Sequence, residues 1–200
     1  MEFLVVVSLL ALAGWTWKAR DQGRRIQLLG QHLAPFQIEK QMESLTQGYL
    51  RALGEKDEGR QQQVWALLQS TEQSLSGQFA RFAAGFARVP AQDARASKLP
   101  IYLPLADRLA AASFDVREVL AIHAQGIARA ARNEAGAPAR AAAFTMSAEL
   151  FLMQHTCHWF CKSKTVASAR LLARHQTAYR QVLEAVTPET RAAYSALVGP

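Results

Sequence analysis

An uncharged run near the start of the sequence constrains the fold most. Residues 3–17 read FLVVVSLLALAGWTW and contain no charged side chain. As an α-helix rising about 1.5 Å per residue, this run is about 23 Å long, somewhat less than the ~30 Å hydrocarbon core of a bilayer. Interfacial side chains just after the run can make up the difference. We therefore predict a transmembrane anchor over residues 1–17, followed by a basic juxtamembrane helix over residues 18–35.

Aromatic and basic side chains at the end of this run set its predicted orientation. Tryptophan is enriched at the membrane–water interface, and Lys and Arg are retained on the cytoplasmic side. Glu2 is the one charge on the N-terminal side. We therefore expect a single-pass protein with residues 18 onward in the cytoplasm. Its Ala-rich, Arg-over-Lys composition is typical of a bacterial protein of high genomic G+C, so the expected location is a bacterial inner membrane. The predicted interface residues are Trp15, Trp17, Lys18, Arg20, Arg24 and Arg25.

Two other interpretations of the uncharged run stay open. Ala11-Leu12-Ala13 resembles the cleavage site of a secretory signal, although the run lacks the basic segment that precedes such signals. A buried or interfacial helix is the second alternative, since apolar stretches of 10–14 residues usually belong to a core. Length alone does not separate these alternatives from the anchor.

The rest of the chain has helical periodicity and no convincing strand alternation. Residues 38–53 and 116–127 each place apolar side chains three or four positions apart, with Ser113 as the expected N-cap of the second helix. Residues 138–161 are apolar nearly all round, which predicts a central helix, and residues 165–186 form an amphipathic one. The longest regular face, which we predict to be packed, comprises Trp65, Leu68, Glu72, Leu75, Phe79, Phe82 and Phe86. The predicted fold is all-α, a bundle of about six helices over residues 36–200.

Prolines interrupt this pattern between residues 90 and 104. Pro90, Pro100 and Pro104 exclude a continuous helix, because a residue before proline avoids the helical conformation. Residues 99–104 nevertheless carry apolar side chains. We expect these side chains to pack onto the bundle, with an interfacial membrane contact as the alternative. Thr187-Pro188 predicts the N-cap and first position of a last helix.

One cluster of side chains has the chemistry of metal or haem ligands. Thiolates and imidazoles bind zinc, copper and haem iron. One helix presents at most two or three such donors to a single ion, so a neighbouring helix would have to complete the site. The haem-attachment motif C-x-x-C-H is absent from the sequence. The candidate metal ligands are His123, His155, Cys157, His158 and Cys161. Free cysteine is also an ordinary core residue, and packing without a cofactor is our preferred interpretation, with a reactive thiol as a third.

A basic stripe follows this cluster. It comprises Lys162, Lys164, Arg170, Arg174 and Arg180. With a formal net charge of +7 for the whole chain, these side chains could meet anionic lipid headgroups or stay solvated. Nucleic acid is the less favoured partner because an anchor is predicted already.

No catalytic motif supports an enzymatic function. The sequence has no nucleophile elbow, phosphate-binding loop, zinc-protease motif or dinucleotide fingerprint. We therefore expect a membrane-anchored, non-enzymatic binding or scaffolding module with a protein partner. A metal- or haem-binding redox or sensor protein is the alternative.

Overall fold

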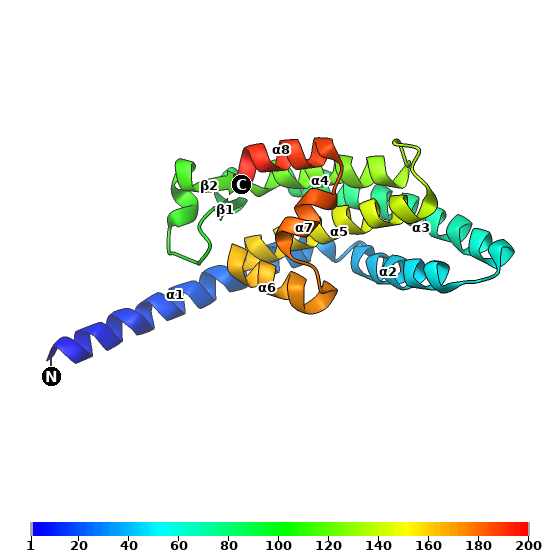
Figure 1. The fold of residues 1–200 in the computed structure, drawn as a ribbon. Coiled ribbons are helices and arrows are strands. Elements are labelled where there is room, and N and C mark those ends of the chain that lie inside the picture. The colour runs from blue at the N-terminus through cyan, green and yellow to red at the C-terminus, as the bar shows by residue number, and fades with distance from the viewer. Residues whose placement is uncertain (1, 200) are drawn as a thin grey trace.

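The computed structural model describes residues 2–199 and is all-α, as predicted (Figure 1). Met1, the first residue of the predicted anchor, and Pro200, the last residue of the predicted bundle, lie outside the described residues. The helices are α1 (Glu2–Leu33), α2 (Ile38–Gly54), α3 (Glu58–Phe86), α4 (Val116–Ala131), α5 (Ala139–Cys161), α6 (Lys164–His175), α7 (Tyr179–Ala185) and α8 (Pro188–Val198). Two short strands, β1 (Arg95–Ser97) and β2 (Ser113–Asp115), pair antiparallel between α3 and α4.

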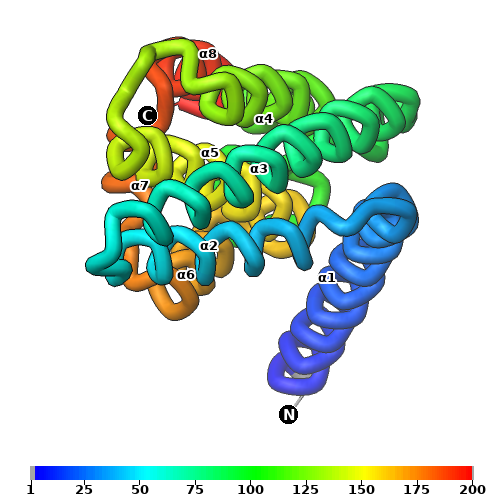
Figure 2. The backbone as a smooth tube through the Cα atoms, turned by 90° about the vertical axis from the view of Figure 1, so that its right-hand side faces the viewer, coloured from blue at the N-terminus to red at the C-terminus, as the bar shows by residue number. Residues whose placement is uncertain are grey.

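Helix α1 leaves the bundle as a single uninterrupted helix (Figures 1 and 2). Its apolar first half is exposed: Phe3 is 78% and Leu10 68% accessible. Its second half packs against the domain, where Gln22 and Leu29 are buried. By length and composition α1 could cross a membrane, and none of its apolar stretch is buried. The alternative of a buried core helix is therefore wrong for residues 3–15.

The core forms around α5, which packs against α4, α6 and α7. Its apolar character on all sides explains this position, because each face meets another helix. The face of α3 that carries Phe79, Phe82 and Phe86 is buried, as the spacing predicts. Phe86 also places its ring edge-on against Phe160 of α5, with ring centroids 5.9 Å apart.

Glu72 interrupts the apolar face of α3 and is bonded to a phenol. Its carboxylate accepts a hydrogen bond from the Tyr49 hydroxyl of α2. Burial raises the pKa of Glu72, while the hydrogen bond from Tyr49 lowers it.

The strands β1 and β2 were not recognisable in the sequence. Each is three residues long, too short to produce a visible alternation. Ser113 belongs to β2 and does not cap α4. The N-cap is Asp115, whose carboxylate accepts a hydrogen bond of 2.9 Å from the Arg117 backbone N–H.

The predicted amphipathic helix over residues 165–186 is divided in two. Gln176 has a left-handed backbone (φ 53°) that ends α6, and α7 begins at Tyr179. An apolar pattern can continue across such a break, which is why the sequence did not reveal it. The last helix begins as predicted: Thr187 is the N-cap, and Pro188 occupies the first position of α8.

Candidate functional site

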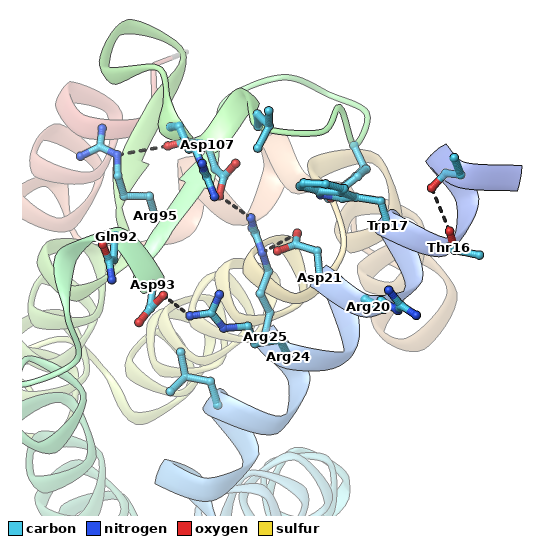
Figure 3. Close-up of a pocket in the computed structure, with 15 residues that line it drawn as sticks. Thr16, Trp17, Arg20, Asp21, Arg24, Arg25, Gln92, Asp93, Arg95 and Asp107 are labelled. Atoms are coloured by element: carbon cyan, nitrogen blue, oxygen red, sulfur yellow. Dashed lines mark hydrogen bonds and ion pairs between the residues drawn. The ribbon is translucent and has the colours of Figure 1, made fainter. Parts of the chain in front are cut away.

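A cavity of about 910 Å³ lies between α1 and the segment 92–108, where α1 meets the domain (Figure 3). One wall is a helical face of α1 that begins within its exposed apolar half. The other wall comes from the connection between α3 and α4, which carries three 3₁₀ turns (Ala91–Asp93, Ala106–Arg108 and Ala110–Ala112). The lining residues are Ala13, Thr16, Trp17, Arg20, Asp21, Arg24, Arg25, Leu28, Gln92, Asp93, Arg95, Tyr102, Leu105, Asp107 and Arg108.

Ion pairs join the two walls of this cavity. Arg24 pairs with Asp93, and an Nη atom of Arg25 lies 2.8 Å from an Oδ atom of Asp107 (Figure 3). Arg25 also pairs with Asp21 one turn earlier in α1, at 3.0 Å. These contacts attach the second half of α1 to a loop that is distant in sequence.

Arg25 is therefore not placed as the sequence predicted. Its side chain is only 12% exposed, and it also donates a hydrogen bond of 3.3 Å to the Phe160 carbonyl. Two carboxylates and a carbonyl take the place of the expected lipid headgroups. Arg24, with a side chain 68% exposed, is paired but remains accessible.

The cavity retains an excess of positive charge. Its lining contains five arginines and three aspartates, a formal balance of +2. The aspartates pair with Arg24 and Arg25, whereas Arg95 donates to the Ser113 hydroxyl at 2.7 Å. The side chains of Arg20 and Arg108 are exposed, and within residues 2–199 neither guanidinium group makes a hydrogen bond or ion pair. These two guanidinium groups are the cations available to a ligand.

Tyr102 closes the cavity near the end of the apolar run. Burial, together with the neighbouring Asp21 carboxylate, raises the pKa of Tyr102 to about 12. Its hydroxyl therefore stays protonated at neutral pH. Lys18 lies over the same ring, with its Nζ atom 6.0 Å from the ring centroid.

The loop that forms one wall of the cavity carries exposed apolar side chains. Ile101 is 58%, Leu103 47% and Leu105 44% exposed, and Trp17 of α1 is 52% exposed. The expectation that the loop packs its apolar side chains onto the bundle is therefore wrong for Ile101 and Leu103. The α6 helix holds the loop backbone from outside the core: the Thr165 hydroxyl donates a hydrogen bond of 2.7 Å to the Pro100 carbonyl.

No protein-family model, curated protein or solved structure matches the chain.

The predicted ligand cluster lies elsewhere, inside the bundle. His123 of α4 and His155 of α5 are both fully buried. The His123 Nε2 atom lies 2.8 Å from the Thr156 hydroxyl, and the His155 Nε2 atom lies 3.0 Å from the Ser168 hydroxyl. Burial is the main cause that lowers the pKa of each imidazole to about 3. Both rings are therefore neutral at pH 7.

The thiols also have the properties of packing residues. Cys161 is buried, and Cys157 is half-buried with its Sγ atom 3.9 Å from the Met153 Sδ atom. Burial raises the pKa of Cys157 to about 12 and that of Cys161 to about 11, so both are thiols at neutral pH. The thiolate is the form that binds metals and attacks electrophiles.

The five candidate ligands do not converge on one point. Across residues 2–199, no group of three or more His, Cys, Asp or Glu side chains could hold a metal ion. His158 is half-buried on α5, and its pKa is lowered to about 4, mainly by burial. The metal hypothesis therefore lacks the geometry that it requires in the described part of the chain.

The predicted basic stripe is divided between two environments. Lys162 donates a hydrogen bond of 3.0 Å to Gln22 of α1, and Lys164 lies over the rings of Trp159 and Tyr179 at 5.1 and 5.3 Å. These two lysines therefore contribute to packing. The solvent-exposed members are Arg170, Arg174 and Arg180.

Five charged residues of the cavity were not singled out from the sequence. They are Asp21, Asp93, Arg95, Asp107 and Arg108. All but Asp21 lie in or beside the proline-containing segment, where no helical or strand periodicity marks a buried face. The available signal was the mixture of acidic and basic side chains within that segment.

Proposed function

We propose that this protein is a single-pass, membrane-anchored helical binding module. Its domain lies on the cytoplasmic surface of a bacterial inner membrane. The observation that carries the proposal is the two-part character of α1: an exposed apolar half continues without a break into a half that is packed and ion-paired to the domain. A helix of this kind joins a bilayer to a folded domain, since an unburied apolar stretch of this length is unfavourable in water.

The loop beside α1 supports a second contact with the bilayer. Leu105 and Tyr102 line the same cavity as Trp17, so this part of the loop lies near a tryptophan, a residue type that favours the membrane interface. Large apolar side chains that gather on a surface mark interaction sites. Under this proposal Ile101 and Leu103 enter the interface while Lys18 and Arg20 meet the headgroups.

A protein partner completes the proposal. The hairpin of α2 and α3 extends away from the end at which α1 leaves the domain (Figure 1). It carries three exposed leucines: Leu50 at 68%, Leu53 at 38% and Leu67 at 70%. Binding is favoured over catalysis because the buried imidazoles are hydrogen-bonded and the thiols are protonated.

Membrane extraction tests the anchor. We expect the full chain to stay in the membrane pellet after alkaline carbonate washing, whereas a variant lacking residues 1–17 becomes soluble and stays helical. A reporter fused after Pro200 should be active only as a cytoplasmic fusion. Release of the full chain by carbonate, a periplasmic reporter or a mature N-terminus at Gly14 would contradict the proposed topology.

A further inference from the structure

We infer that the cavity between α1 and segment 92–108 binds the headgroup of one anionic phospholipid, with Arg20 and Arg108 as its phosphate-binding cations. This inference rests on the proposed membrane attachment and extends it from a general surface contact to a defined site. Three properties of the cavity carry it: its charge, its size and the apolar character of its margin.

The charge of the lining matches an anion. The three aspartates are already paired with Arg24 and Arg25, so they offer little repulsion to a phosphate. Guanidinium groups bind phosphate oxygens through paired N–H donors. Arg20 comes from α1 and Arg108 from the loop, so the two available cations belong to opposite walls.

The size and position of the cavity favour a lipid over a small soluble anion. A volume of about 910 Å³ is at the upper end of the range of ~300–1,000 Å³ that is typical of pockets for organic ligands. Inorganic phosphate would leave most of that space unfilled. The lining extends from the arginines to Ala13 and Trp17 in the apolar part of α1, so acyl chains attached to a bound headgroup have an apolar exit toward the bilayer.

The walls of the site are held in place before a ligand arrives. Arg25, with 12% of its side chain exposed, joins α1 to Asp107 and to the Phe160 carbonyl. Arg95 fixes the loop by donating to the Ser113 hydroxyl and to the Asp107 carbonyl at 3.2 Å. Neighbouring arginines thus have different roles: Arg25 and Arg95 position the walls, and Arg20 and Arg108 remain for the ligand.

Lipid titration followed by native mass spectrometry tests the inference. The full chain in detergent is titrated with dioleoyl phosphatidylglycerol, dioleoyl phosphatidylcholine or inorganic phosphate. We expect one phosphatidylglycerol to bind in preference to phosphatidylcholine, without displacement by millimolar phosphate. The double variant R20Q/R108Q should bind it about 30-fold more weakly, from two lost charge contacts of ordinary strength at a membrane surface.

A matched variant controls for net charge. R51Q/R191Q removes two exposed arginines from α2 and α8, outside the cavity, and should bind as the wild type does. Both double variants should melt at the wild-type temperature, and both should remain in the membrane pellet because α1 is intact.

Three results would overturn the inference: equal affinity of R20Q/R108Q and wild type, equal binding of the two lipids, or displacement of the lipid by inorganic phosphate. The last would show that the site takes a soluble anion. Each of these leaves the anchor unaffected. Failure of the proposed membrane attachment would appear separately, as release of the wild-type chain by carbonate.

Discussion

The arginine–aspartate cluster beside α1 and the histidine network inside the bundle place polar side chains in opposite settings. In the cluster, charged groups pair with one another and line a cavity in which, within the described chain, two guanidinium groups stay unpaired. In the network, His123 and His155 are neutral, fully buried and bonded to the hydroxyls of Thr156 and Ser168. The first arrangement can receive a ligand without rearrangement, whereas the second would have to open.

The difference changes which residues are functional candidates. Thiols and imidazoles are intrinsically more reactive than guanidinium groups, yet here burial keeps them uncharged. Three of the arginines, Arg20, Arg24 and Arg25, come directly after the apolar stretch of α1 and line the cavity. Exposure and available charge, rather than intrinsic reactivity, distinguish the site from the core.

The largest expected effect lies on the buried side, at Phe86. This ring is fully buried and contacts two other helices, with its centroid 5.3 Å from that of His32 in α1 and 5.9 Å from that of Phe160 in α5. Phe86→Ala should lower the free energy of unfolding by about 3–5 kcal/mol. Urea denaturation followed by tryptophan fluorescence measures this loss.

Phe144→Ala is the matched control for that substitution. Phe144 is 56% exposed on α5, so its truncation should change the free energy of unfolding by no more than about 0.5 kcal/mol. Similar losses in the two variants would show that Phe86 is not part of a closed core.

The next largest effect is the dependence of stability on pH. Because burial lowers the folded-state pKa of His123 to about 3 from an ordinary value of 6.5, the unfolded chain binds more protons between these values. The contribution of His123 is therefore complete above about pH 6.5 and is lost as the pH falls toward 3, amounting to about 2 kcal/mol between pH 7 and pH 5. Unfolding free energies measured across this range test the expectation.

His123→Gln isolates this contribution from other titrating groups. Its amide can still bond the Thr156 hydroxyl but does not titrate. The variant should therefore lose less stability than the wild type between pH 7 and pH 5. Parallel pH profiles for the two proteins would mean that His123 is accessible to protons in the folded state, and the contrast between the two regions would fail.

The smallest expected losses of stability come from substitutions of two adjacent arginines of α1. Arg25→Gln leaves Asp21 and Asp107 without their partner and should cost on the order of 1.5 kcal/mol. Arg24→Gln breaks a pair whose arginine is 68% exposed, and should cost less than about 1 kcal/mol. Hydrogen exchange of the backbone amides in residues 18–33 should increase more in the first variant. Equal exchange would show that Arg25 does not hold α1 to the domain.

Much of the fold was predictable because helices carry their own signal. The phenylalanines of α3 recur at helical spacing and are buried, and Thr187-Pro188 marks the start of α8 through its capping geometry. The cavity had no such signal. Arg24 and Asp93 are 69 positions apart, and Arg25 and Asp107 are 82 apart. A contact between an irregular loop and a distant helix depends on the tertiary arrangement, which periodicity does not record.

The continuity of α1 has a mechanical consequence. A straight helix of 32 residues is about 48 Å long, and a change in tilt of about 20° displaces one end by roughly 16 Å relative to the other. Under the proposed attachment, the domain would follow every reorientation of the membrane segment, since Arg25 and Leu29 hold α1 to it. The apolar stretch of about 23 Å is shorter than an average hydrocarbon core. In a thicker bilayer the domain and the loop 101–105 would therefore lie against the membrane surface, and in a thinner bilayer they would lie farther from it. Bilayer thickness would thus set the distance between the cavity and the lipids.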